Sequence, residues 1–397
     1  MSPTARRFGV GTLCATALAL GGGVAPARGE PGDPLFGPFY ATVAKEGAAH
    51  SSYPPNGFEG PCGLAVDSGG NFYVSDYYHD VVDVFKPSLA YRFQVKKEDP
   101  LDGPCGLAVD TTGNLYVNTF HRDVVRYAPF ASNIKGPGTV IDSARPTGVA
   151  VDPGTGNVYV DDRTYVAVYE PSGAPLEVGG KPLRIGEGSL GDGYGVAVSG
   201  FGETAGYVYV PDAADGTVKV YDPAVDTEDP VETIDGHETP EGRFVSLRDA
   251  AIAVDQASGL VYVADDLQPE YFERPEAAIY AFKATGAYAG RLKYNVVDAR
   301  PAGLAVGKGR VYVTSGNSDD AYVLVYESGA LTTSAFPPLG ADVPDIGPPA
   351  PVTSAAAAPV EATAPAPGPV RSLPELSRFR HRHHARHRHH RAHRRGR

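Results

Sequence analysis

The sequence has no tryptophan, a single methionine and only three cysteines among its 397 residues. It also lacks the motifs of common enzyme classes: no Gly-x-Ser-x-Gly, phosphate-binding loop, Cys-x-x-Cys or His-Glu-x-x-His is present. No segment of 36–336 keeps apolar residues at helical spacing over three turns, which argues against a helical core. The 42% hydrophobic and 21% charged content excludes a wholly disordered chain, a collagen and a multi-span membrane protein.

Charge is distributed unevenly along the chain. Residues 371–397 hold ten Arg and one Glu, whereas residues 28–370 carry 23 basic against 46 acidic side chains. A body with that excess of negative charge repels phosphate backbones and anionic lipid surfaces. The composition therefore excludes nucleic acid as a partner of the acidic body.

The first 27 residues have the three-part layout of a signal peptide. Arg6 and Arg7 precede an apolar run over 8–20, and small residues suitable for cleavage follow. About 13 apolar residues are too few to span a bilayer, so we expect no transmembrane segment in the mature chain. The arginine pair also permits twin-arginine export, and Cys14 permits a lipoprotein, although its preceding residue is unsuitable. The protein is predicted to be secreted or associated with the cell envelope.

One unit recurs six times in the body of the chain. A Gly-Leu-Ala-Val-Asp phrase comes first, a Tyr-Val phrase second, and a strand-like stretch ending in an aromatic residue third. The central alanines of the first phrase are Ala65, Ala108, Ala150, Ala197, Ala253 and Ala305. A weaker fourth strand precedes each new copy, and four short antiparallel strands per ~45 residues are typical of a propeller blade.

The repeat resembles the NHL-repeat family of β-propellers, in its secreted bacterial type. The resemblance rests on Pro-x-Gly-Leu-Ala-Val-Asp, Gly-Asn-x-Tyr-Val-x-Asp and Val-x-Val-Phe in that order, most clearly in 61–85, 104–127 and 146–169. It implies an all-β fold, a six-bladed propeller of four-stranded antiparallel blades over 36–336. The family includes protein-, RNA- and ligand-binding members and some enzymes, so the resemblance indicates the fold and says little about function.

Two segments compete to close the ring. Phe39–Val43 precedes the first copy and reads as an outer strand, which we expect to join the last blade so that no edge is left exposed. Leu331–Phe336 is the other candidate for that place.

The C-terminal segments are not expected to contribute to the core. Residues 337–370 contain ten Pro and nine Ala, a composition typical of an extended linker. Residues 371–397 form an Arg- and His-rich basic tail that we predict to be disordered. The tail could remain solvated, attach to an anionic envelope polymer, capture metal through its seven His, or dock on the acidic body.

Few residues suggest chemistry. The positions just before the six inner strands hold no carboxylate and no imidazole: they are Cys62, Cys105, Thr147, Tyr194, Ala250 and Ala302. The sequence therefore predicts no catalytic residue, no metal site and no cofactor. We interpret the recurring aspartates after the second phrase as acceptors of backbone N–H groups rather than calcium ligands. These aspartates are Asp76, Asp162, Asp212 and Asp265.

Cys62 and Cys105 occupy equivalent places in adjacent blades. Under sixfold symmetry their separation equals their distance from the axis, and a disulfide needs Cα atoms roughly 4.4–6.8 Å apart. Residues of an inner strand meet that condition, so the two are a disulfide candidate. Two packed thiols are the other interpretation.

One face of the propeller is predicted to bind a ligand. The loops entering the inner strands and leaving the second strands emerge there, and they carry aromatic and Arg residues. The candidates are Tyr77, Tyr78, His79, Phe120, His121, Arg145, Arg163, Arg248 and Arg300, with Tyr165, Tyr271 and Phe272 beside them. The arginines would favour an anionic or carbohydrate-like ligand. They could instead be paired with Asp192, Asp249 and Glu59.

Together these features predict a secreted binding or interaction module held at the cell envelope by its tail. Its partner would be a protein, a carbohydrate or an anionic envelope polymer. The alternative is a secreted propeller enzyme, either a lactonase-like hydrolase or a lyase. An enzyme should show polar residues that converge in a pocket, whereas a binder should show aromatic and Arg residues spread over the rim.

Overall fold

The computed structural model describes ten stretches of the chain together with Pro54. These are residues 39–43, 57–95, 101–119, 122–129, 138–248, 251–267, 276–292, 296–297, 302–315 and 321–328. All of them belong to the unit Met1–Ser334. The predicted signal peptide, linker and basic tail lie outside the described residues, and so does Leu331–Phe336.

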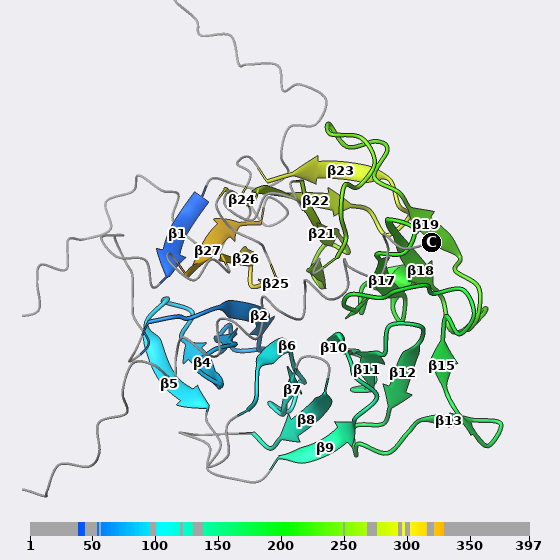
Figure 1. Ribbon diagram of the computed structural model, residues 1–397, viewed down its shortest axis with the longest axis horizontal. Helices are drawn as coiled ribbons and strands as arrows, with labels where there is room; N and C mark the ends of the chain where they lie inside the picture. The colour runs from blue at the N-terminus through cyan, green and yellow to red at the C-terminus, as the bar shows by residue number, and fades with distance from the viewer. Residues whose placement is uncertain are drawn as a thin grey trace, which may run out of the picture. The chain divides into compact units, whose positions relative to one another are not determined.

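The described strands form six main antiparallel sheets, which are the blades of a propeller (Figure 1). Blade 1 contains β2 (Pro61–Val66), β3 (Phe72–Asp76), β4 (Val81–Phe85) and β5 (Tyr91–Val95). Blade 2 contains β6 (Pro104–Val109), β7 (Leu115–Thr119), β8 (Asp123–Tyr127) and β9 (Thr139–Asp142). Blade 3 contains β10 (Gly148–Val151), β11 (Val158–Asp161), β12 (Val166–Tyr169) and β15 (Arg184–Ile185).

The second half of the ring repeats this order. Blade 4 contains β16 (Ala197–Val198), β17 (Val208–Asp212), β18 (Thr217–Tyr221) and β19 (Glu232–Ile234). Blade 5 contains β20 (Ile252–Val254), β21 (Val261–Asp266), β22 (Glu276–Phe282), β23 (Tyr288–Arg291) and the short β24 (Val296–Val297). Blade 6 contains β25 (Leu304–Gly307), β26 (Arg310–Ser315), β27 (Tyr322–Glu327) and β1 (Phe39–Val43).

Blade 3 carries an addition that the repeat did not predict. Between β12 and β15 the chain forms a two-stranded hairpin of β13 (Glu177–Val178) and β14 (Lys181–Pro182). One turn of 3-10 helix, Gly202–Thr204, lies between β16 and β17. No helix in the described part of the chain has the length and apolar character needed to cross a membrane.

The ring closes in two ways. Each inner strand contacts the next, from β2 through β6, β10, β16, β20 and β25 and back to β2. The N-terminal β1 then supplies the outer strand of blade 6 by pairing antiparallel with β27, for example Thr42 opposite Leu324. The prediction that Phe39–Val43 closes the ring is therefore confirmed.

Small residues at the inner strands allow the blades to converge. A Cβ atom at Gly148 would lie 2.6 Å from the Cα atom of Gly195 in the next blade, so no side chain fits there. Farther out, the tyrosine of each Tyr-Val phrase is buried between blades. These residues are Tyr73, Tyr116, Tyr159, Tyr209, Tyr262 and Tyr312. The core thus consists of apolar layers between adjacent blades.

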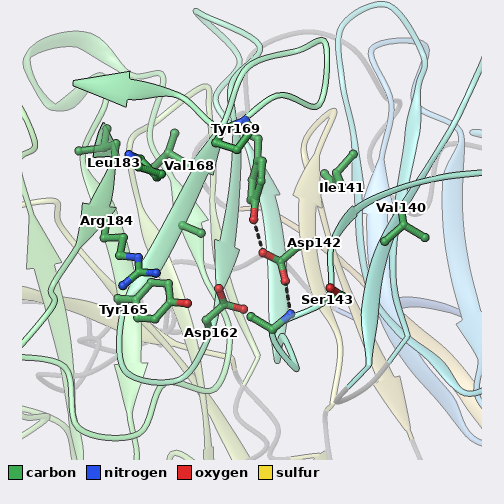
Figure 2. Close-up of a pocket in the computed structure, with 14 residues that line it drawn as sticks. Val140, Ile141, Asp142, Ser143, Asp162, Tyr165, Val168, Tyr169, Leu183 and Arg184 are labelled. Carbon is green, nitrogen blue, oxygen red and sulfur yellow. Dashed lines mark hydrogen bonds between the residues drawn. The ribbon is translucent and has the colours of Figure 1, made fainter. Parts of the chain in front are cut away.

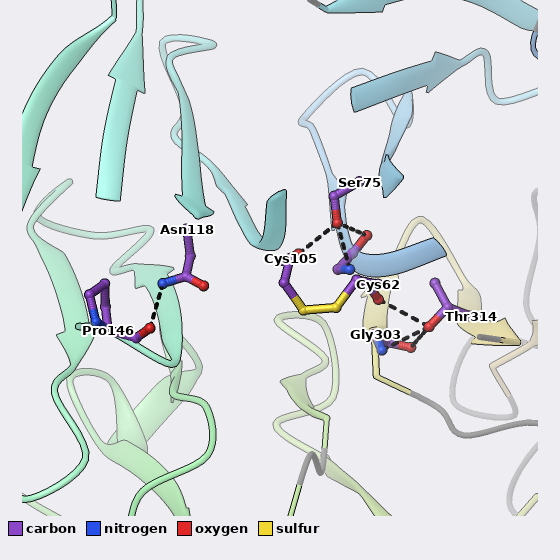
Figure 3. Close-up of a disulfide and its surroundings, with 8 residues drawn as sticks. Cys62, Ser75, Cys105, Asn118, Pro146, Gly303 and Thr314 are labelled. Carbon is purple, nitrogen blue, oxygen red and sulfur yellow. Dashed lines mark hydrogen bonds between the residues drawn. A yellow bond between two sulfur atoms is a disulfide. The ribbon is translucent and has the colours of Figure 1, made fainter. Parts of the chain in front are cut away.

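A disulfide and several hydrogen bonds join adjacent blades near the axis (Figure 3). Cys62 and Cys105 form a disulfide between blades 1 and 2, with Cα atoms 4.8 Å apart. The hydroxyl of Ser75 donates to the Cys105 carbonyl at 2.7 Å, and that of Thr314 donates to the Cys62 carbonyl at 3.0 Å. These hydrogen bonds lie where neighbouring inner strands would otherwise leave carbonyl groups unpaired.

The residue at the place of Ser75 and Thr314 differs from blade to blade. Asn118 donates to the Pro146 carbonyl at 3.0 Å and so joins blade 2 to blade 3. Asp161 accepts the N–H of Gly195 at 2.9 Å and joins blade 3 to blade 4. At the matching places of blades 4 and 5 the chain has Pro211 and Ala264, whose side chains form no hydrogen bonds.

Candidate functional site

The recurring aspartates hold the loops that enter the inner strands. Asp76 accepts the N–H of Glu59 at 2.9 Å, and Asp265 accepts that of Val245 at 2.9 Å. Asp212 accepts the N–H groups of Gly191, Asp192 and Ala214 at 2.8, 2.9 and 3.0 Å. For these three the structure agrees with the interpretation as backbone acceptors, although the partner is mainly the preceding loop.

Asp162 departs from this pattern, and its interpretation as a loop anchor is wrong. In blade 3 the loop N–H of Ala144 is already taken by Asp142 at 2.7 Å. Asp161, one residue earlier, binds the hydroxyl of Thr147 at 2.7 Å. Asp162 is 8% exposed, yet neither of its carboxylate oxygens accepts a hydrogen bond from the described residues. A buried carboxylate without donors is costly and marks a candidate functional group.

Asp162 faces a pocket of about 480 Å³ between blades 2 and 3 (Figure 2). Strand β9 forms one wall, and β12, β15 and the segment joining them form the other. Asp142, Asp162, Tyr165 and Arg184 gather toward one end of the lining. The Arg184 guanidinium lies 4.3 Å from the centroid of the Tyr165 ring. The pocket therefore brings two carboxylates, a phenol and a guanidinium together.

The surroundings of Asp162 in the pocket raise the pKa of its carboxyl group. Burial above all, together with the charges of Asp142 and Asp161, raises the pKa of Asp162 to about 7. The Tyr165 hydroxyl faces Asp162 and partly offsets this rise, without the geometry of a full hydrogen bond. A carboxyl group that titrates near neutrality can either accept or donate a proton in a reaction.

Asp142 differs from Asp162 in its hydrogen bonds. It accepts a hydrogen bond from the Tyr169 hydroxyl and one from the Ala144 N–H. Burial and the bond to Asp142 raise the pKa of Tyr169, so this phenol stays protonated. Asp142 is thus satisfied by donors while Asp162 is not, and the two carboxylates have separate roles.

The structure brings some of the predicted face residues together. Arg163 donates to Asp192 at 2.8 Å, and Arg248 donates to the Tyr194 hydroxyl at 2.8 Å and lies 3.6 Å from Asp192. Both guanidinium groups lie over the Tyr194 ring. The arginines are therefore paired with an acidic partner, as the competing interpretation held for Asp192.

Other predicted residues form a separate group in blade 1. The rings of Tyr77 and Tyr78 meet edge to face at 5.0 Å, and Tyr78 is 57% exposed. His79 contacts Asp76 at 2.8 Å and Glu59 at 3.4 Å.

The remaining face residues are not joined to these clusters. Arg145 is exposed, with a φ of 73°. Five candidates lie outside the described residues: Phe120, His121, Tyr271, Phe272 and Arg300.

Sequence reasoning missed the two lining residues Asp142 and Arg184. One signal was available: blade 3 carries the pair Asp161–Asp162 where blades 1 and 4 carry a single acid. Two acids cannot both occupy the one anchoring place. Within the described ranges no three His, Cys, Asp or Glu side chains converge as metal ligands.

Solved structures with the same fold have low sequence identity to this chain. The PQQ-bound aldose sugar dehydrogenase from Streptomyces coelicolor is 16% identical, with a TM-score of 0.46 over 74% of this chain and 99% of that one. A gluconolactonase from Xanthomonas campestris is 15% identical, with a TM-score of 0.47 over 76% and 99%. An inactive virginiamycin B lyase from Staphylococcus aureus, solved with quinupristin, is 11% identical, with a TM-score of 0.44 over 72% and 89%. At these values the likeness concerns the fold alone.

No protein-family model matches the sequence, and no curated protein matches it. The resemblance to NHL repeats is thus shown only as far as the six-bladed propeller. The sequence favoured a binding or interaction module, whereas these structures of the same fold are a dehydrogenase, a lactonase and a lyase, as in the enzyme alternative.

Proposed function

We propose that this chain is a propeller hydrolase that opens lactones or esters in the pocket between blades 2 and 3. The observation that supports it is the environment of Asp162, a buried carboxylate that accepts no hydrogen bond from the described residues and faces this pocket. Tyr165 and Arg184 lie beside it and supply donors.

Asp162 acts as the general base of the reaction. Its carboxylate takes a proton from a water molecule, whose oxygen attacks the carbonyl carbon of the substrate. The bond from that carbon to the ring or ester oxygen then breaks, and Asp162 returns the proton to the departing alkoxide. One water is consumed and a hydroxy acid, or an acid and an alcohol, is released.

Tyr165 and Arg184 stabilise the negative charge that develops on the carbonyl oxygen. A phenol and a guanidinium are both hydrogen-bond donors at neutral pH, and burial raises the pKa of Tyr165 so that it keeps its proton. Arg184 is also paired with Glu187 at 2.7 Å, which holds its side chain over the Tyr165 ring. These donors come from β15 and from the turn before β12, so the blade itself positions them.

The enzyme is proposed to work outside the cytoplasm. The disulfide between Cys62 and Cys105 supports this, because structural disulfides persist in oxidising compartments. The predicted signal peptide over 1–27 gives the route of export.

The test is hydrolysis of a panel of five- and six-membered lactones and simple esters, followed by acid release. The rate should rise with pH through about 7 as Asp162 loses its proton. Asp162→Asn should lower kcat/KM about 100-fold or more. The matched control is Asp226→Asn, an exposed surface carboxylate that should leave the rate unchanged.

Two results would overturn the proposal. One is full activity in Asp162→Asn. The other is a product with the mass of the substrate and a new double bond, which would indicate elimination instead of hydrolysis.

A further inference from the structure

The pocket of Asp162 has two chemically different ends. The polar groups gather at one end, while the rest of the lining includes Val140, Ile141, Ala167, Pro182 and Leu183. Figure 2 shows Leu183 above Arg184 and Ile141 across from it, both farther up in the view than Asp162 and Tyr165, while Val140 lies beyond Ile141 on the β9 side. The proposed hydrolysis uses only the polar end, so the apolar wall is unexplained by it.

The apolar wall is built by the part of blade 3 that departs from the repeat. The β13–β14 hairpin and its flanks supply Pro175, Pro182 and Leu183 to the lining. Among the described sheets, no other blade carries a hairpin of this kind between its third and fourth strands. The insertion therefore does not serve the ring as a whole, and it changes the one pocket in which Asp162 lies.

Val140 on the opposite wall shows that this apolar surface is left open. Val140 is 55% exposed although it lies on strand β9. An exposed valine in the lining of a pocket gains stability when an apolar group covers it. The natural occupant of that space is hydrocarbon.

Building on the proposed hydrolysis, we infer that the substrates are neutral lactones or esters that carry an unbranched aliphatic chain. The reacting group lies against Asp162, and the chain lies along Val140, Ile141 and Leu183. Arg184 is already paired with Glu187, so the polar end does not call for an anionic substituent. Polyhydroxylated lactones would leave hydroxyl groups against the apolar wall without partners.

The experiment compares γ-lactones whose side chain grows from methyl to heptyl. We expect kcat/KM to rise about fourfold per methylene, the factor that corresponds to burial of one CH₂, until the wall is covered. Val140→Ser should flatten this increase. Val225→Ser, an exposed valine of blade 4, is the matched control and should keep the full series.

Failure of this inference is distinguishable from failure of the proposed function. If Asp162→Asn abolishes hydrolysis but the wild-type series is flat, or a polyhydroxylated lactone of equal size is preferred, the inference is overturned and the hydrolase stands. If no lactone is hydrolysed, titration calorimetry with the corresponding alkyl lactams still shows whether the pocket binds the alkyl chain. Affinity that increases with chain length and is reduced by Val140→Ser supports the inference, and equal affinities overturn it.

Discussion

Asp212 in blade 4 and Asp162 in blade 3 follow the same Tyr-Val phrase, and their surroundings are opposite. Asp212 accepts three backbone N–H groups of neighbouring loops. Asp162 accepts none from the described residues, because Asp142 has taken the loop donor and Asp161 ties the axis. One carboxylate can therefore stabilise a blade, while its counterpart becomes available for chemistry when a neighbour takes over its hydrogen bonds.

The largest expected effect is on stability. Asp212→Ala should lower the free energy of unfolding by about 3 kcal/mol, because three partly buried N–H groups lose their acceptor. Asp162→Ala should cost less than about 1 kcal/mol or stabilise the protein, because it removes an unsatisfied buried charge. Urea unfolding of both variants at pH 7.5 measures the difference. Equal losses in the two variants would show that Asp162 stabilises its blade as Asp212 does.

The second expected effect is a pH dependence that belongs to Asp162. Its pKa is raised to about 7 in the folded state, so the folded protein binds a proton more tightly than the unfolded chain. Stability should therefore fall as pH rises from about 4 to 7, by about 1–2 kcal/mol after allowance for solvent screening. Burial also raises the pKa of Asp83 to about 7 and of Asp265 to about 6.

Subtracting the curve of Asp162→Asn isolates the contribution of Asp162 from those of the other buried acids. The variant should be more stable than the wild type above pH 7 and should lose this advantage at pH 4. Parallel curves for the two proteins would contradict the assignment.

A smaller effect is expected at Asp142, which accepts the N–H of Ala144. Asp142→Asn removes a negative charge that raises the pKa of Asp162. The ascending limb of the activity profile should move toward lower pH by a fraction of a unit, while the asparagine oxygen still accepts the Ala144 N–H. The pH dependence of kcat/KM measures this shift. A shift toward higher pH would show that Asp142 acts in another way.

The smallest effect is expected at Arg163, which is adjacent to Asp162 in sequence but pairs with Asp192. Arg163→Gln should change the free energy of unfolding by no more than about 1 kcal/mol, the usual range for an exposed ion pair. It should leave hydrolysis unchanged, because its side chain binds outside the pocket. A large loss of activity would move the site from the pocket to the Arg163–Arg248 pair.

The fold could be read from the sequence because six copies of one pattern report the same local geometry. The ring closure by Phe39–Val43 followed from the same pattern, since an unpaired strand needs a sheet edge. The pocket could not be read in this way. In sequence, Asp162 looks like Asp76 and Asp212, and only the placement of the loop donor of Ala144 separates them. Such a donor depends on loop conformation, which the repeat does not specify.

The pairing of β1 with β27 also sets the timing of assembly. Thr42 is synthesised early and its partner Leu324 late, so blade 6 stays incomplete until most of the chain exists. At about 5–20 residues per second, β1 waits on the order of tens of seconds for its partner. During that interval the edge of β27 has not yet formed, so the ring cannot close until its final blade is made.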